Sequence, residues 1–271
     1  MALFTFPFRQ KILFGTARVS IVEALTAYSA PCNKMSPEVT HKHIKLSPRL
    51  EAAAALIGVV QTAADVGADH GFLSLSLLQR GACKRVIATD ISAACLERAA
   101  KSASESALCV ELDFRVGDGL LPLMPYEADA IAICGMGGEL IIKILSAAKP
   151  KLKGAGKAVL QPMTKVEQLR RYLYNNCYKV VQDLVVEDAG RLYQVFSVEP
   201  GQDSLPVGWP DEFFMFGHAA LFDPGFLALA DRLQRGLEKR LKNAKGTEGE
   251  PKLKAKLNCI RQVLALRAGA K

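Results

Sequence analysis

Short apolar runs alternate with longer amphipathic stretches along most of this chain, and this alternation limits the folds it can adopt. We predict strands at Ala63–Val66, Arg85–Thr89, Glu111–Val116, Ala130–Cys134, Ala158–Gln161, Val180–Glu187 and Tyr193–Val198. Helical patterns lie between them, at Leu73–Arg80, Ala93–Ser104, Glu139–Ala147 and Lys165–Asn175. Strands that alternate with helices in this way are typical of an α/β fold, in which helices cover a parallel sheet.

The last two predicted strands are connected differently from the others. The segment DAGR joins them, which is too short for a helical crossover and indicates an antiparallel hairpin. A mostly parallel sheet that ends in an antiparallel hairpin is the usual build of the Rossmann-like methyltransferases. Nicotinamide-binding domains generally continue in parallel.

The regions before and after the predicted sheet differ from it in composition. Residues 1–43 are basic and contain no acid before Glu23, so we predict an N-terminal extension that is disordered, transit-like or the product of a mis-annotated start, with Met35 as the alternative. Residues 44–200 hold the sheet. Residues 201–271 begin with the linker GQDSLPVGWPDE and continue with two amphipathic segments, Leu227–Leu241 and Leu253–Leu264. Two such segments predict a helical hairpin, or coiled-coil arm.

Charge and cysteine content narrow the choice of partner and compartment. The formal net charge is +8, and basic residues concentrate between Lys143 and Arg171 and between Arg235 and Arg261. Such clusters attract phosphate, although each is equally compatible with a solvated surface. The seven cysteines form no Cys-x-x-Cys pair, and no run of eighteen apolar residues occurs. We therefore predict reduced thiols, a cytoplasmic location, no metal site and no membrane span.

Four acidic or glycine-rich turns follow four successive predicted strands. The first, DVGADHG, places Asp65 at a strand end and Gly67 and Gly71 in a turn before a helix. Asp90 follows about twenty residues later, where an acid commonly binds the two ribose hydroxyls. Asp118 can accept a hydrogen bond from an adenine amino group, and the fourth turn reads CGMGGEL. Each acid could instead cap a helix or form a turn, but ligands bind at the carboxyl ends of strands in such sheets.

The centre of the first turn distinguishes between cofactors. Asp69 and His70 stand where a phosphate-binding loop would have an uncharged residue. A carboxylate there would repel a pyrophosphate, whereas S-adenosylmethionine carries a sulfonium cation and no phosphate. The charged turn therefore favours the methyl donor over NAD or FAD.

These motifs make the chain resemble the bacterial tRNA (adenine-22-N1)-methyltransferase family, TrmK. The matching pieces are LSPRLEAAAALI, DVGADHGFL, ATDIS, VGDGL, CGMGGELI, LQPM followed by LRRYLYNN, and EDAGRLYQV, and they cover roughly residues 46 to 200. The first loop departs from the family at Ala68, at Gly71-Phe72-Leu73 and at Ser74. The resemblance implies an S-adenosyl-L-methionine-dependent methyltransferase domain over residues 44–200, a C-terminal coiled coil, and tRNA as substrate.

Site residues follow from the motifs and from the resemblance together. Cofactor contacts are predicted for Asp65, Gly67, His70, Gly71, Asp90, Ile91, Asp118, Gly119, Cys134, Gly135, Met136 and Gly137. Adenine N1 needs no deprotonation, so the chemistry asks for a carboxylate near the base edge, and Asp69 is the predicted catalytic residue. Substrate contacts are predicted for Gly138, Gln161, Pro162, Lys165, Arg170, Arg171, Arg235, Lys239, Arg240 and Lys242.

Other functions stay open at this stage. A methyltransferase of the same fold could act on another RNA or on a small molecule. A nicotinamide-dependent oxidoreductase is disfavoured by Asp69 and by the terminal hairpin, and a non-catalytic RNA-binding module would keep the fold without turnover. The fourth turn lacks the Asn/Asp-Pro-Pro-aromatic box of enzymes that act on exocyclic amines, and it lacks a Pro-Cys nucleophile. We expect a monomer or weak dimer.

Overall fold

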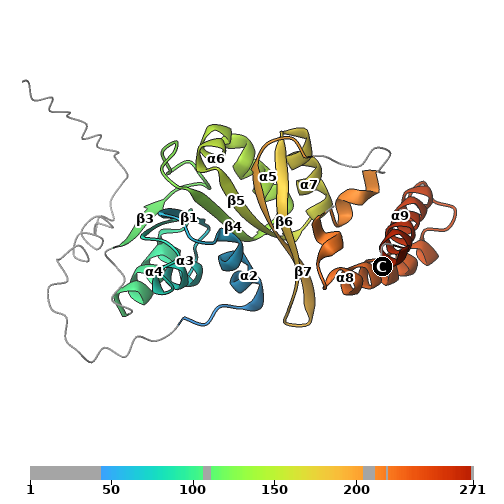
Figure 1. Ribbon diagram of the computed structural model, residues 1–271, viewed down its shortest axis with the longest axis horizontal. Helices are drawn as coiled ribbons and strands as arrows, with labels where there is room; N and C mark the ends of the chain where they lie inside the picture. The colour runs from blue at the N-terminus through green and yellow to red at the C-terminus, as the bar shows by residue number, and fades with distance from the viewer. Residues whose placement is uncertain (1–43, 106–110, 204–210, 218, 270–271) are drawn as a thin grey trace, which may run out of the picture. The chain divides into compact units, whose positions relative to one another are not determined.

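The computed structural model describes residues 44–105, 111–203, 211–217 and 219–269 (Figure 1). Its centre is a seven-stranded sheet in the order β3-β2-β1-β4-β5-β7-β6. The strands are β1 (Thr62–Val66), β2 (Arg85–Asp90), β3 (Leu112–Val116), β4 (Ala130–Gly137), β5 (Lys157–Thr164), β6 (Tyr178–Asp188) and β7 (Arg191–Pro200). The first five are mutually parallel, and β7 runs antiparallel to both β5 and β6. The predicted methyltransferase-type sheet is confirmed, whereas the predicted N-terminal extension lies outside the described residues.

Helices connect and cover the strands. They are α2 (Pro48–Ile57), α3 (Phe72–Gln79), α4 (Ala93–Glu105), α5 (Gly138–Ala147), α6 (Lys149–Ala155), α7 (Val166–Asn175), α8 (Phe226–Asn243) and α9 (Glu250–Gly269), with short 3-10 turns η2 (Asp211–Met215) and η3 (Ala219–Phe222). The sequence patterns did not predict α2 or α6 as helices. In α2, Ser47 occupies the N-cap, Pro48 the first turn and Gly58 the C-cap, which together set both helix ends. In the described segments, none of the helices combines the length and hydropathy that a membrane span needs.

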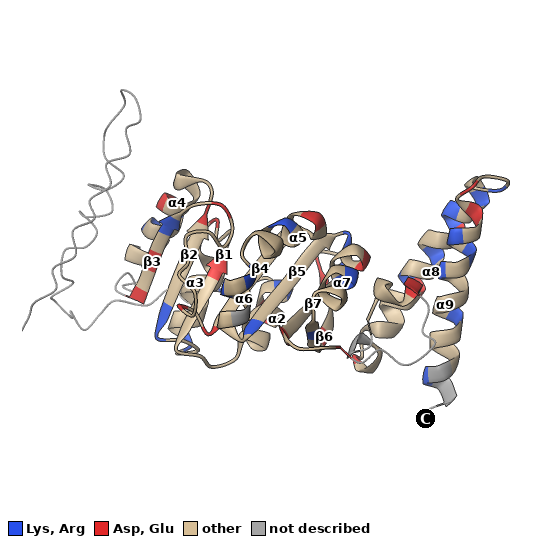
Figure 2. Cartoon of the chain, turned by 90° about the horizontal axis from the view of Figure 1, so that it is seen from above, with Lys and Arg blue, Asp and Glu red and all other residues tan. Residues whose placement is uncertain are grey.

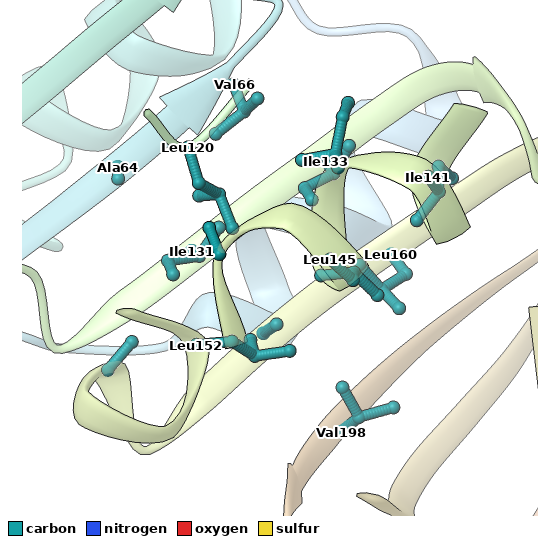
Figure 3. Close-up of a cluster of buried hydrophobic side chains, with 14 of the residues drawn as sticks. Ala64, Val66, Leu120, Ile131, Ile133, Ile141, Leu145, Leu152, Leu160 and Val198 are labelled. Atoms are coloured by element: carbon teal, nitrogen blue, oxygen red, sulfur yellow. The ribbon is translucent and has the colours of Figure 1, made fainter. Parts of the chain in front are cut away.

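Alternate residues of the central strands face two different apolar layers. Ile131 and Ile133 of β4 pack with residues of α5, α6 and α7, as Figure 3 shows for part of this cluster. Ala130 and Ala132 of the same strand pack in the second cluster, with residues of α2 and α3. Successive side chains of a strand point to opposite faces, so a run of apolar residues fills both layers. Helices therefore cover both faces of the central strands. The polar residues discussed below follow the carboxyl ends of these strands.

A third apolar cluster joins the C-terminal helices to the hairpin. Residues of η2, α8 and α9 pack together, and Val185 of β6 and Leu192 of β7 pack against them. Phe213 and Phe226 both contact Phe216 edge-to-face, with ring centroids 5.3 and 5.4 Å apart. The predicted helical pair is confirmed, and it is anchored to the two strands that end the sheet.

Candidate functional site at the carboxyl edge of the sheet

The loop between β1 and α3 turns sharply at three residues in the left-handed region. Gly67, Asp69 and Gly71 have φ values of 74°, 47° and 71°. The amides of Gly67 and Ala68 both donate to the carbonyl oxygen of Thr89, at 2.8 and 3.1 Å, which fastens the loop to the end of β2. Glycine adopts this conformation without a Cβ penalty, and Asp tolerates it better than most residues.

Side chains pack closely against both glycines. A Cβ on Gly71 would lie 2.9 Å from Cβ of Ala99 in α4. A Cβ on Gly67 would overlap Cε of Met136, the residue that follows Gly135 in the fourth turn. The first and fourth turns are thus in contact, as the predicted cofactor site requires.

Asp65 lies below this loop inside the protein. Its side chain is part of a residue that is only 4% exposed, and its Oδ2 accepts a hydrogen bond of 2.7 Å from Oγ of Ser74. Burial raises the pKa of Asp65 to about 6 against the hydrogen bonds from Ser74, and the neighbouring carboxylate of Asp90 raises it further. In the part of the chain that the structure describes, no cationic side chain offsets the charge of Asp65.

Asp69 lies at the surface of the loop. Its side chain is 59% exposed, Oδ1 accepts a hydrogen bond of 3.0 Å from Arg98 of α4, and Oδ2 lies 3.8 Å from Nε2 of His70. Partial burial is the largest single influence and would raise the pKa of Asp69, but the hydrogen bonds from Arg98 and Cys95 and the charges of His70 and Arg98 together hold that pKa below its usual value. Asp69 is consequently ionised at neutral pH and can act as a hydrogen-bond acceptor. The His70 ring stacks on Phe72, with ring centroids 5.5 Å apart.

Asp90 ends β2 beside the first loop. Its Oδ2 accepts from the amide of Asp69 at 3.2 Å, and its Oδ1 accepts from the amide of Ser92 at 2.8 Å. Each carboxylate oxygen can accept a second hydrogen bond, so Asp90 can still bind a diol. The next residue, Ile91, is 74% exposed, which leaves an apolar surface beside the acid.

Asp118 lies in the third turn, which is linked to the second. The amide of Gly117 donates to the carbonyl of Asp90 at 2.9 Å, and the carbonyl of Gly119 accepts from Oγ1 of Thr89 at 3.1 Å. Asp118 itself is exposed. The structure therefore brings the predicted ribose acid and the predicted adenine acid to one part of the sheet edge.

The fourth turn opens toward free space at Gly135. This glycine has a φ of 76°, and a Cβ built on it would meet no atom within 4 Å. Its amide donates to Oε1 of Gln161 at 2.9 Å. Cys134, one residue earlier, packs with the second apolar cluster, and burial raises the pKa of its thiol well above the usual range, so it is unsuited to act as a nucleophile.

The charges around these turns suit a cation better than a phosphate. The four carboxylates of Asp65, Asp69, Asp90 and Asp118 follow or form the first three turns, whereas the guanidinium of Arg98 is already paired with Asp69. A pyrophosphate would be repelled, and a sulfonium or ammonium group would be attracted. No cluster of three His, Cys, Asp or Glu side chains in the described part of the chain could hold a metal ion.

Four of the residues predicted to contact substrate are buried. Arg170 is only 3% exposed and pairs with Asp183 at 2.6 Å. Gln161 is 0% exposed and supports the fourth turn from behind. Pro162 and Gly138 are buried too, and a Cβ on Gly138 would lie 2.6 Å from the carbonyl oxygen of Lys165. The sequence pattern did not reveal that these four residues are buried.

The other predicted substrate residues are exposed cations or line a groove. Lys165, Arg171 and Arg240 line a groove of about 720 Å³ between α7, η2, α8 and α9, together with Lys252 and Lys256. Arg235, Lys239 and Lys242 are exposed on α8, where Figure 2 shows basic residues gathered, and Arg235 pairs with Asp231 at 2.6 Å. The two basic clusters of the sequence therefore meet, although they are far apart along the chain.

Comparison with known proteins decides the family. A family model described as a methyltransferase domain matches residues 46–196, which is more than half of the chain. The chain belongs to this methyltransferase family. Its four turns are accordingly the turns of a methyltransferase domain.

Relatives of this methyltransferase extend the comparison. A tRNA (adenine(22)-N(1))-methyltransferase of Bacillus subtilis is 35% identical over 158 residues, which are 58% of this chain and 66% of the relative, just under two thirds of its length. The solved structure of the B. subtilis m1A22 tRNA methyltransferase TrmK has a TM-score of 0.72 and 28% identity, and the match covers 82% of this chain and 99% of that one. A Streptococcus pneumoniae protein solved in complex with S-adenosyl-L-methionine has a TM-score of 0.71 and 28% identity, with 80% and 98% covered.

Two arginines with contacts near these turns were not singled out in the sequence. Arg98, which holds Asp69, lies in the middle of an amphipathic helix and carries no local signal. Arg49 lies in the segment LSPRLEAAAALI and contacts residues at the ends of β5 and β6. Only the match of that segment to the family could have drawn attention to Arg49.

Proposed function

We propose that this chain transfers a methyl group from S-adenosyl-L-methionine to N1 of an adenine in tRNA. The observation that carries the proposal is the set of four carboxylates around a glycine-rich turn, because it suits a cationic donor and not a dinucleotide. The names of the relatives supply the tRNA adenine and the position, adenine 22. The match covers only part of the curated relative, so activity and substrate belong to the proposal.

The donor would lie across the first three turns. Asp90 would accept from the ribose hydroxyls, Ile91 would cover one face of the adenine, and Asp118 with Gly119 would bind its amino edge. Asp65, below the loop, would stabilise the positive end of the donor. When bound, the donor supplies a methyl group activated by a sulfonium ion.

The base would approach from the fourth turn. Gly135 leaves open space there, and Gln161 holds its amide in place. Adenine N1 already has a lone pair, so the protein must align the base and stabilise the charge that passes to it. Asp69 is the proposed catalytic residue because it is ionised, 59% exposed and able to accept from the adenine amino group through Oδ2.

The two functional parts of the proposal are residues 44–200, which would bind donor and base, and residues 201–271, which would help to bind the tRNA. N1 lies on the Watson–Crick edge, so a paired target must leave its helix at a cost of a few kcal/mol. Phosphate contacts along the basic groove and α8 would offset that cost. We keep a cytoplasmic location and a monomer or weak dimer as parts of the same proposal.

A binding and transfer experiment tests the proposal. We expect calorimetry to detect S-adenosylhomocysteine binding but no NADH binding, and labelled methyl to pass from the donor to unmodified tRNA. Binding of NADH alone would revive the oxidoreductase. Donor binding with transfer only to another RNA or to a small molecule would favour the second methyltransferase function, and binding without any transfer would favour an RNA-binding module.

A further inference from the structure

Arg49 links three segments that lie far apart in the sequence. It belongs to the first turn of α2, its NH1 donates to Sδ of Met163 at 3.1 Å, and its Nε lies 3.3 Å from Oδ2 of Asp188. The guanidinium also lies over the ring of Tyr193, 5.5 Å from the centroid. Met163 is the penultimate residue of β5, Asp188 ends β6, and Tyr193 is the third residue of β7.

The register of the strands places this cluster at the carboxyl edge. The pairing of β5 with β7 ends at Leu160 and Phe196, and Arg49 contacts Met163, three residues further along β5, and Tyr193, three residues nearer the hairpin turn on β7. Asp188 pairs with Arg191 at the end of the hairpin, five residues along β7 from Phe196. The hairpin therefore continues past the part of β7 that pairs with β5, and Arg49 contacts it there.

A short chain of contacts connects Arg49 to the open turn at Gly135. The Sδ of Met163 accepts from Arg49 and lies 3.5 Å from Nε2 of Gln161, whose Oε1 holds the amide of Gly135. Burial and the charge of Asp65 raise the pKa of Cys134, and the positive charge of Arg49 is close enough to oppose this rise in part. Arg49 thus lies on the side of the turn away from β1 and from the donor loop.

The hydrogen-bonding capacity of Arg49 is mostly unused. A thioether sulfur is a weak acceptor, and Nε is buried without a hydrogen bond of good geometry to any described residue. The side chain remains 29% exposed. A guanidinium offers five N–H donors in a planar fork that fits a phosphate, so its outer edge can bind an anion while Nε stays near Asp188.

We propose that Arg49 binds a backbone phosphate of the RNA next to the target adenine. This inference rests on the proposed function and adds a positioning residue to it. A phosphate is favoured over the base itself because methylation at N1 leaves a cation, which an adjacent guanidinium would destabilise. It is favoured over the carboxylate of the donor because β4 and β5 separate Arg49 from the donor loop.

The test compares Arg49→Met and Arg49→Lys in the full chain. The readouts are the affinity for an unmodified tRNA transcript across a potassium chloride series, kcat and KM for tRNA, and calorimetric affinity for S-adenosylhomocysteine. For Arg49→Met we expect tRNA affinity to fall about tenfold and the salt slope to fall by about 0.7 to 0.9, the value for one lost phosphate contact. Arg49→Lys should recover the slope but only part of kcat, since it lacks the fork.

Matched controls separate binding from folding. Arg80 pairs with an acid of α2, Glu51, but it is the C-cap residue of α3, which packs against β2 and α2 and not against the hairpin, so Arg80→Met should leave the salt slope and the KM for tRNA unchanged. If Arg49→Met does not fold, Asp188→Asn keeps the guanidinium and removes its acid, and we expect it to maintain or raise tRNA affinity.

Three results would overturn the inference. The first is an unchanged salt slope of tRNA binding in Arg49→Met. The second is that Arg49→Met loses tenfold in affinity for S-adenosylhomocysteine and not for tRNA. The third is a loss of tRNA affinity in Asp188→Asn. If the wild-type chain methylates no tRNA, the proposed function fails, and the binding series, which needs no turnover, still decides the role of Arg49.

Discussion

Ser74 donates a hydrogen bond of 2.7 Å to the buried carboxylate of Asp65, directly below the loop Gly67–Gly71. The acid belongs to the strand and the hydroxyl to the helix that the loop joins, so the pair ties β1 to α3. The hydroxyl and the backbone amide of Ser74 both donate to Asp65, but burial still raises the pKa of this carboxyl group to about 6, so a cationic ligand nearby would stabilise its ionised form.

Replacing Asp65 by Asn should stabilise the donor-free protein at neutral pH. The folded-state pKa is raised from 3.8 to about 6, so the folded protein binds more protons between these values and stability falls as pH rises through that window. The shift corresponds to about 3 kcal/mol, which Asp65→Asn should recover above pH 6 and not below pH 4. Urea unfolding of the wild-type chain and of Asp65→Asn at pH 4 and pH 8 measures this difference in the free energy of unfolding. Equal stability of the two proteins at pH 8, or unchanged S-adenosylhomocysteine affinity, would contradict the assignment.

Gly71→Ala should cost more stability than Gly135→Ala. Both residues have φ above 70°, so each substitution costs about 1 to 2 kcal/mol in the left-handed region. At Gly71 the new methyl also meets Ala99 at 2.9 Å, while at Gly135 it meets no atom within 4 Å. Chemical denaturation should rank the two variants in this order, and Ala99→Gly should partly rescue Gly71→Ala. Equal costs would mean that the packing of α4 on the loop is not tight.

Arg170→Met should destabilise the protein by about 3 to 5 kcal/mol, since it leaves the buried carboxylate of Asp183 without its cation. Arg170 also donates to Gln194, which in turn donates to the carbonyl of Met215, so the variant should loosen η2. Arg171 follows Arg170 directly, but its side chain is one-third exposed. Arg171→Gln should therefore lower the free energy of unfolding by less than about 1 kcal/mol. Denaturant unfolding midpoints of the two variants measure this difference in stability. A loss of less than about 1 kcal/mol in Arg170→Met would show that the hydrogen bonds and ion pair of Arg170 do not stabilise the fold.

Asp69→Asn should lower kcat at least tenfold and leave KM for the methyl donor within about threefold, because the amide cannot stabilise the cationic base as the carboxylate does. Arg98→Gln is the matched variant, since it frees Asp69 without removing it. Steady-state kinetics, with the concentrations of tRNA and of the methyl donor both varied, gives kcat and the two KM values for each variant. A rise in donor KM alone would assign Asp69 to the donor loop.

Reversing charge on α8 should weaken tRNA binding. Lys239→Glu with Lys242→Glu should lower affinity and reduce the salt slope by about 2, if each lysine contacts one phosphate. Lys84→Glu with Lys101→Glu makes the same change in net charge on exposed residues of the sheet domain. An equal loss in both pairs would point to net charge and not to a surface on α8.

The sequence predicted the fold well because its elements carry local signals. Strand and helix patterns, the DAGR hairpin and the glycine turns each follow from a few adjacent residues. The ends were less accurate: β6 and β7 reach Tyr178 and Pro200, because pairing between the two strands extends them beyond their apolar runs.

Side-chain direction was the part that sequence could not provide. Arg170 and Arg171 are adjacent and chemically alike, yet one is buried against Phe196 and Asp183 while the other lines a groove. Helix phase and the packing of η2 decide between them, and both depend on segments far along the chain. The pairing of Asp69 with Arg98 depends on α4 in the same way.

Nucleoside mass spectrometry with position mapping tests directly whether this chain methylates N1 of an adenine in tRNA. Unmodified tRNA is incubated with the chain and with labelled S-adenosyl-L-methionine, digested, and compared with tRNA incubated without donor. We expect labelled N1-methyladenosine at a single site in the tRNA, adenine 22. Label on another atom or nucleotide, or no label in tRNA under conditions where the donor binds, would contradict it.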